Sequence, residues 1–182
     1  MKIGMIAMAA KPYHIGHDAL IRIAASENDR VNVFVGTGDR SRSGEFPVSG
    51  QAMLDIWLKY ISKTLPQNVW VHYVKAPLRN LFNTVGVINE LHDRSLIVNI
   101  YGDSTDIARQ FPPNTLKKYF NQMYSQGRLR LRPIPRKMTV NISGTKMREW
   151  LSNGKKNQFI NALPRTLRKN GEDIWKTLTE DL

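Results

Sequence analysis

Residues 2–17, KIGMIAMAAKPYHIGH, join a short apolar run to a turn that carries two histidines. The run over residues 2–8 has no helical stripe of apolar side chains, and this pattern predicts a strand. Residues 17–29 (HDALIRIAASEND) place their apolar side chains on one side, which predicts a helix. A strand, a turn and a helix in this order form the first part of a βαβ unit.

The same alternation continues along the chain. Further strands are predicted where valine and isoleucine cluster, at residues 30–38, 68–74 and 95–103. Apolar periodicity predicts helices at residues 51–65, 80–92, 113–126, 144–154, 156–162 and 164–180. Residues 128–136 read as basic and extended, and residues 139–143 are predicted to form a last short strand or a turn.

Strands that alternate with helices predict a parallel sheet with helices on both faces. We therefore predict an α/β fold: a single doubly wound, Rossmann-like domain with a mostly parallel five-stranded sheet and a helical C-terminal tail. Residues 1–155 would form the domain, and residues 156–182 a helical C-terminal extension packed on it. Ligands of such sheets bind beyond the carboxyl ends of the strands, where the turn with the histidines lies.

The composition restricts the classes of protein and of partner. The chain has 27 Lys and Arg against 15 Asp and Glu, a net charge of +12, and such a field attracts polyanions. It has no cysteine, which excludes disulfides and thiolate metal sites. No apolar run approaches the roughly 20 residues of a membrane span, and the first apolar run leads straight into a turn without a cleavage zone. We expect a cytoplasmic protein without a membrane partner.

The turn residues can bind phosphate. Three positions apart at a helix start, His14 and His17 can face the same side. Gly16 allows a ligand to approach the backbone closely, and the helix start offers free N–H groups. Lys11 adds a positive charge. Together these groups could hold a phosphate chain and stabilise charge that develops on it.

Two other interpretations of the histidine pair are weaker. A zinc site would need further ligands, and the remaining histidines, His72 and His92, belong to no ligand motif, so we predict no metal-binding residue. Alternatively, one histidine caps the helix and the other lies on the surface.

Two motifs carry a resemblance to a known family. His14-Ile15-Gly16-His17 resembles the signature of the HxGH nucleotidyltransferase superfamily, whose members are cytidylyltransferase-like. Ile142-Ser143-Gly144-Thr145-Lys146-Met147-Arg148 resembles the second signature of the small transferases, I-S-S/G-T-x-x-R. The resemblance covers roughly residues 1–155, the predicted nucleotidyltransferase domain.

The resemblance implies a nucleotidyltransferase, in which an acceptor phosphate attacks the α-phosphorus of a nucleoside triphosphate and releases pyrophosphate. The catalytic residues would be His14, His17, Lys11 and Arg148. The residues that bind the nucleotide would be Met8, Ala9, Gly16, Gly102, Asp103, Ile142, Ser143 and Thr145. Mg²⁺ would be carried by the phosphates with few protein ligands. Asp103 would meet a ribose or base, or else cap a helix.

Small nicotinamide-mononucleotide adenylyltransferases are the most similar group. Their length, their S-G-T-x-x-R motif and a loop with Pro and Gly before a long helix are all matched here. The resemblance implies AMP transfer from ATP to nicotinamide mononucleotide, a step of NAD biosynthesis. Ala9 stands where that group usually has an arginine, for which Lys11 could substitute. A cytidylyltransferase that uses CTP and a small phosphorylated alcohol is an alternative, although the aspartate typical before its HxGH motif is missing.

The basic charge supports a hypothesis of another class. Five basic residues gather in one stretch: Arg128, Arg130, Arg132, Arg136 and Lys137. They could grip nucleic acid, either in a binding protein or in a transferase that acts on a nucleic-acid end. The paired motifs favour catalysis, and the sequence leaves open whether the chain forms a homo-oligomer.

Overall fold

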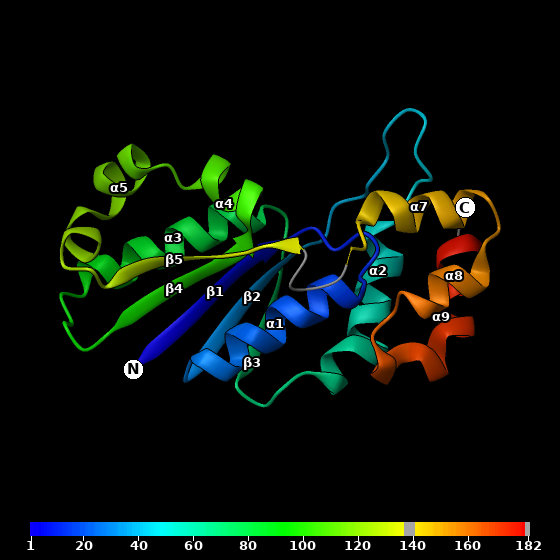
Figure 1. Ribbon diagram of the computed structural model, residues 1–182, viewed down its shortest axis with the longest axis horizontal. Coiled ribbons are helices and arrows are strands. Elements are labelled where there is room, and N and C mark those ends of the chain that lie inside the picture. Colours follow the sequence, from blue (N-terminus) through cyan, green and yellow to red (C-terminus); the bar gives the residue numbers. More distant parts are fainter. Residues whose placement is uncertain (137–140, 181–182) are drawn as a thin grey trace.

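The computed structural model of the protein describes residues 1–136 and 141–180. Its strands form one parallel sheet in the order β3-β2-β1-β4-β5 (Figure 1). The strands are β1 (Lys2–Met8), β2 (Arg30–Gly36), β3 (Val69–Val74), β4 (Ile97–Asp103) and β5 (Leu129–Ile134). The prediction of a mostly parallel five-stranded sheet is confirmed, and the fifth strand lies in the basic stretch. Central strand β1 is paired on both sides, with Met5 opposite Asn32 of β2 and Ile100 of β4.

Helices connect and cover the strands. The α-helices are α1 (Ile15–Glu27), α2 (Gly50–Ile56), α3 (Pro77–Glu90), α4 (Ser104–Gln110), α5 (Pro113–Ser125), α7 (Gly144–Ser152), α8 (Lys156–Asn161) and α9 (Gly171–Glu180). Helical turns of other types are η1 (Trp57–Ile61, a π-helix), η2 (Ser62–Thr64, a 3₁₀-helix) and η3 (Arg165–Asn170, a 3₁₀-helix).

Three corrections concern the predicted helices and one concerns the predicted strand or turn at residues 139–143. The helix predicted at residues 51–65 is α-helical only to Ile56 and then changes to η1 and η2. The helix predicted at residues 164–180 begins as the 3₁₀-helix η3. Helix α4 was missed because only Ile107 of its side chains is buried, which leaves no apolar stripe to detect. Of the predicted strand or turn at 139–143, residues 141–143 are not a strand, and the first two lie outside the described residues.

Alternate side chains of β1 point to opposite faces, as the period of a strand requires. Ile3 and Met5 belong to the core between the sheet and helices α3 and α5. Ile6 and Met8 belong to the core on the other face, with α1, α2 and α7. The C-terminal segment from α8 through η3 to α9 contributes to this second core with the buried side chains Phe159, Ala162, Leu163, Leu167, Ile174 and Leu178.

The doubly wound arrangement puts helix starts near the carboxyl ends of the strands, among them those of α1, α4 and α7. Helix α1 follows β1, α4 follows β4, and α7 begins beyond β5 (Figure 1). Helices α7, α8 and α9 lie together beyond this end of the sheet (Figure 1). Over the described parts of the chain, no helix is both long and apolar enough to span a membrane.

Candidate active site

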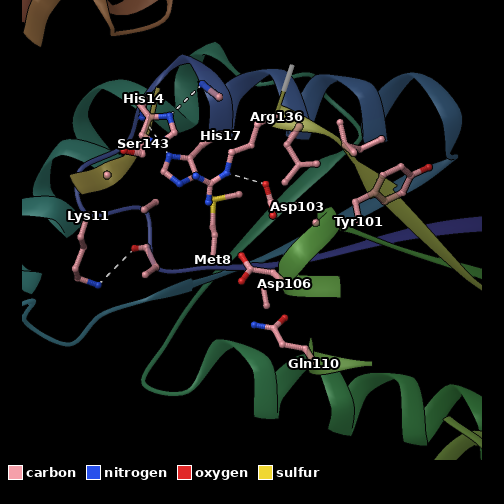
Figure 2. A pocket seen from close by; sticks show the side chains of 18 of the residues that line it. Met8, Lys11, His14, His17, Tyr101, Asp103, Asp106, Gln110, Arg136 and Ser143 are labelled. Carbon is pink, nitrogen blue, oxygen red and sulfur yellow. Dashed lines mark hydrogen bonds and ion pairs between the residues drawn. The ribbon is translucent and has the colours of Figure 1, made fainter. Parts of the chain in front are cut away.

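A cleft of about 450 Å³ opens at the carboxyl ends of β1 and β4 (Figure 2). It is lined by the turn between β1 and α1, by the end of β4 with α4, by Arg136, and by the start of α7. The cleft brings together every site residue predicted from the sequence except Thr145: Met8, Ala9, Lys11, His14, Gly16, His17, Gly102, Asp103, Ile142, Ser143 and Arg148. Figure 2 shows the two imidazoles close together, with Asp103, Asp106 and Gln110 on the side of β4 and α4.

The turn before α1 is held by contacts from distant parts of the chain. Ala10 has a φ of +50°, and the Lys11–Pro12 peptide bond is cis. The buried Tyr13 donates a hydrogen bond from its hydroxyl to Asp18 at 3.0 Å. The N–H of Ile15, at the start of α1, donates to the carbonyl of Ala162 at 2.9 Å. The C-terminal segment therefore helps to position the first motif.

His14 and His17 form a reciprocal cap at the start of α1. The Nδ1 atom of His14 accepts a hydrogen bond from the N–H of Gly16 at 3.1 Å. The Nδ1 atom of His17 accepts one from the N–H of His14 at 3.2 Å. The two rings are stacked with their centroids 3.8 Å apart. His14 thus caps the helix, which agrees with the alternative interpretation that one histidine is a cap. His17, however, lies in the cleft and not on the outer surface.

These hydrogen bonds determine which ring nitrogens carry protons. A ring nitrogen that accepts a hydrogen bond is unprotonated, so each neutral imidazole has its proton on Nε2. Within residues 1–136 and 141–180, neither Nε2 atom has a hydrogen-bonding partner of its own. The pair therefore offers two N–H donors to a ligand in the cleft.

The histidine pair is neutral near pH 7. Burial, together with the positive charge of Arg136, lowers the pKa of His14 to about 4. Burial and the neighbouring His14 lower the pKa of His17 well below its ordinary value. Both rings therefore act as hydrogen-bond donors and not as cations in the free protein.

Acid is expected to destabilise the protein through His14. Its pKa is about 4 in the folded chain against an ordinary 6.5, so below pH 6.5 the unfolded state takes up the proton first. The free energy of unfolding should lose about 3 kcal/mol from this group between pH 7 and pH 4. His14→Asn keeps a capping acceptor but cannot titrate. As the pH falls from 7 to 4, the free energy of unfolding of His14→Asn, measured in urea, should rise by this amount relative to that of the wild type. Parallel pH profiles of the two proteins would contradict the low pKa of His14.

Lys11 lies at the edge of the cleft, with its ammonium group held by backbone. Its Nζ atom donates to the carbonyl of Gly36 at 2.6 Å and approaches that of Ala9 at 3.5 Å. Burial lowers the pKa of Lys11, and the charge of Asp39 opposes this effect. The lysine connects the ends of β1 and β2 and brings a positive charge to the place where the sequence predicted one.

The second motif starts α7 and reaches back to the first. The Ser143 hydroxyl accepts a hydrogen bond from the N–H of Lys146 at 3.2 Å and so caps the helix. The buried guanidinium of Arg148 donates to the carbonyl of Lys11 at 2.8 Å. It also donates to the Thr145 hydroxyl at 3.2 Å. Thr145 therefore contacts Arg148 from the preceding turn of α7 and does not line the cleft, contrary to the expectation for a residue that binds nucleotide.

Asp103 has two partners at the end of β4. One of its carboxylate oxygens accepts from the N–H of Thr105 at 2.9 Å and caps α4, which is one of the two roles expected for it. The other accepts from Arg136 at 2.8 Å (Figure 2). Burial acts to raise the pKa of Asp103, but these hydrogen bonds hold it below its ordinary value.

Several cleft residues were missed by the sequence reasoning. The missed side chains that bear polar groups are Arg40, Tyr101, Asp106, Arg109, Gln110 and Arg136. Asp106 and Gln110 are four residues apart on α4, and the spacing would have placed them on one face had that helix been predicted. Arg40 lies in a loop, where no periodicity could have located it.

Comparisons with known proteins agree with this fold. Residues 3–74 match the sequence model of the citrate lyase ligase C-terminal domain family, a match that covers less than half of the chain. No curated protein matches the chain in sequence.

Solved structures with the same fold include three adenylyltransferase-related proteins. A Vibrio parahaemolyticus protein assigned as a nicotinate-nucleotide adenylyltransferase is 16% identical, with a TM-score of 0.56 over 94% of this chain and 98% of that one. A Plasmodium falciparum nicotinic acid mononucleotide adenylyltransferase complexed with NaAD is 15% identical, with a TM-score of 0.55 over 96% of both chains. A Francisella tularensis bifunctional NMN adenylyltransferase/ADP ribose pyrophosphatase, complexed with AMP and manganese, is 13% identical, with a TM-score of 0.59. The present chain is covered over 98% and spans 52% of that protein.

The fold is therefore the nucleotidyltransferase fold. The resemblance to the HxGH superfamily, inferred from two short motifs, agrees with the partial family match and with the fold of these structural neighbours. Fold and family match together support a nucleotidyltransferase, and the identity of its substrates is a separate question.

Proposed function

We propose that the protein transfers AMP from ATP to a small phosphorylated acceptor, such as nicotinamide mononucleotide, and releases pyrophosphate. The observation that carries this proposal is the stacked pair of neutral histidines, which line the cleft at the start of α1. Their Nε2–H groups have no partner within the described residues. The structural neighbours named as adenylyltransferases support the choice of AMP.

The proposed mechanism depends on position and charge. The triphosphate lies across the start of α1, where backbone N–H groups and the Nε2–H groups of His14 and His17 donate to its oxygens. An oxygen of the acceptor phosphate attacks the α-phosphorus, and the bond to the pyrophosphate oxygen breaks. The attacking oxygen is already anionic, so no side chain needs to remove a proton. The histidines stabilise the charge that builds up on the pentavalent phosphorus.

The chain's residues fit a metal ion that arrives with the nucleotide. The described residues contain no group of three or more His, Cys, Asp or Glu side chains placed to hold a metal. In the cleft, Asp103 is paired with Arg136, and Asp106 with Arg109 at 2.9 Å. Magnesium would thus belong to the substrate as MgATP, where it neutralises phosphate charge.

The cleft has the size of a small-molecule site and extends beyond the histidines. Its volume of about 450 Å³ lies in the range of small-molecule sites. Beyond the histidines it continues past Asp103 to Asp106 and Gln110 of α4, so polar groups are available to a second substrate on this side (Figure 2).

The basic stretch favours nucleic-acid binding less than its composition suggested. Arg128 is buried and donates to the carbonyls of Asp93 and Leu96 at 2.9 and 3.0 Å. Arg132 is paired with Glu27 at 3.0 Å. Lys137 lies outside the described residues. Because arginines of this stretch are engaged with the chain itself, a small acceptor is the better proposal.

Pyrophosphate release tests the proposal. The protein is incubated with Mg²⁺, one nucleoside triphosphate and one phosphorylated acceptor, with nicotinamide mononucleotide tried first. We expect release with ATP and with no more than one or two acceptors. Release with CTP and a phosphorylated alcohol would keep the mechanism and replace both substrates. No release with any pair, together with salt-sensitive binding to DNA or RNA, would overturn the proposal.

A further inference from the structure

The loop between β2 and α2, residues 37–49, stands beside the start of α7 (Figure 1). Its base is closed by two backbone hydrogen bonds between Arg40 and Val48, both of 2.9 Å. A further bond of 2.7 Å runs from the N–H of Gly50 to the carboxylate of Asp39. The tip of the loop, residues 41–44, is exposed. The loop therefore has a fixed base and a tip that few contacts restrain.

Glu45, next to this tip, binds two arginines of the cleft. Arg40 donates to both of its carboxylate oxygens, at 2.8 and 3.0 Å. Arg148 of the second motif forms an ion pair with it at 3.2 Å. Hydrogen bonding by Arg40, together with the charges of Arg148, Arg40 and Arg42, lowers the pKa of Glu45 to about 2. The carboxylate is thus ionised at any pH at which the protein would work.

The chain's own oxygens occupy the guanidinium of Arg148. Its Nη1 atom donates to the carbonyl of Lys11, its Nη2 atom donates to Thr145, and Nη2 and Nε both lie near Glu45. The residue that the second motif would supply to a triphosphate therefore already holds an anionic group. A ligand phosphate that binds this guanidinium therefore competes with the Glu45 carboxylate for it.

We propose that Glu45 is an internal anion that occupies Arg40 and Arg148 in the nucleotide-free protein and that the polyphosphate chain of the nucleotide displaces it. For the identity of the natural ligand, this inference rests on the proposed function. It makes Glu45 a residue that determines affinity: its carboxylate competes with the terminal phosphates for the two guanidinium groups.

Charge and exposure make this exchange feasible. Three arginines, Arg40, Arg42 and Arg148, act on a single carboxylate, so the cluster keeps an excess of positive charge. A polyphosphate carries several negative charges and offers oxygens with the spacing that a guanidinium binds in a bidentate manner. The side chain of Glu45 is 25% exposed and lies next to the exposed tip, so little packing is lost when it is released.

Binding of inorganic tripolyphosphate, measured by calorimetry without metal, tests the inference. Glu45→Gln removes the competing charge and keeps the size of the side chain. We expect it to bind tripolyphosphate about tenfold more tightly than the wild type. The matched control is Glu149→Gln, which removes an exposed carboxylate of α7 that pairs with Lys146 at 3.0 Å and does not contact Arg148. Its affinity should stay within about twofold of the wild type.

Hydrogen exchange gives a second, independent measurement. When tripolyphosphate displaces Glu45 from the wild type, the amide of Glu45, which now donates to the carbonyl of Arg42 at 3.0 Å, should exchange faster. Unchanged or weaker binding by Glu45→Gln would contradict the inference, since Glu45 would then position the arginines. Equal gains in affinity by Glu45→Gln and Glu149→Gln would contradict it as well. So would slower exchange of the Glu45 amide, or a lack of tripolyphosphate binding by both the wild type and Glu45→Gln.

The two proposals can fail separately. Turnover with ATP, combined with no gain in affinity from Glu45→Gln, would keep the function and overturn the role of Glu45. Tighter tripolyphosphate binding by Glu45→Gln, in a protein that releases no pyrophosphate with any substrate pair, would keep that role and overturn the function.

Discussion

Replacing His17 by alanine is expected to lower kcat for pyrophosphate release by about 10²- to 10³-fold and to leave the fold intact. The Nε2–H of His17 lies in the cleft beside that of His14, where it can donate to charge that develops on the α-phosphorus. Loss of one such preorganised donor in an enzyme costs about 10²- to 10³-fold in rate. Initial rates at saturating substrates measure the effect, and circular dichroism establishes whether the variant is folded.

Two further variants separate donation from helix capping. His17→Asn keeps a side-chain acceptor near the position of Nδ1, which now accepts from the N–H of His14, and lacks the Nε2 donor. It should be as slow as His17→Ala but nearly as stable as the wild type. His92→Ala is the matched control, because His92 is exposed and contacts Gln122 at 2.7 Å, away from the cleft. Its rate should be unchanged, and a normal rate in both His17 variants would overturn the mechanism.

The second large effect is expected at Gly50, the first residue of α2. A Cβ atom at this position would lie 2.0 Å from the carbonyl oxygen of Thr37 and 2.9 Å from backbone carbons of Thr37 and Gly38. These neighbours are backbone atoms, so the loop base must shift to admit even one methyl group. We expect Gly50→Ala to lower the free energy of unfolding by about 3 kcal/mol.

Urea unfolding of Gly50→Ala, compared with a control from the same loop, measures this cost. The control is Gly38→Ala, because a Cβ atom there would meet nothing within 4 Å. Its stability should change by no more than about 0.5 kcal/mol. Since Gly50 also donates to Asp39 and so closes the base of the loop, its replacement should disturb the position of Glu45 as well. Equal stability of the two variants would show that the loop base adapts freely.

The sequence by itself determined the order of the strands along the chain, the α/β class and the first site motif. These features depend on local patterns: an apolar run predicts β1, and the spacing of His14 and His17 places both at the start of α1. Ser143 stands directly before α7, where a hydroxyl side chain caps a helix start. Eleven of the twelve predicted site residues line one cleft. The α/β class implies this, because parallel strands bring their carboxyl ends to one edge of the sheet. Their roles in catalysis are still predictions.

Only the tertiary structure decided the partners of the charged groups. Arg148 reaches Lys11 and Glu45 across more than 100 residues of chain, and it also donates to Thr145, which does not line the cleft. Arg136, one of the basic residues that the sequence offered to nucleic acid, donates to Asp103 in the cleft. Hydrophobic periodicity records which face of an element is buried, whereas a salt bridge depends on where two separate elements end in space. For this reason the sequence predicts where the phosphate site lies, and the fold decides which of its cations are already occupied.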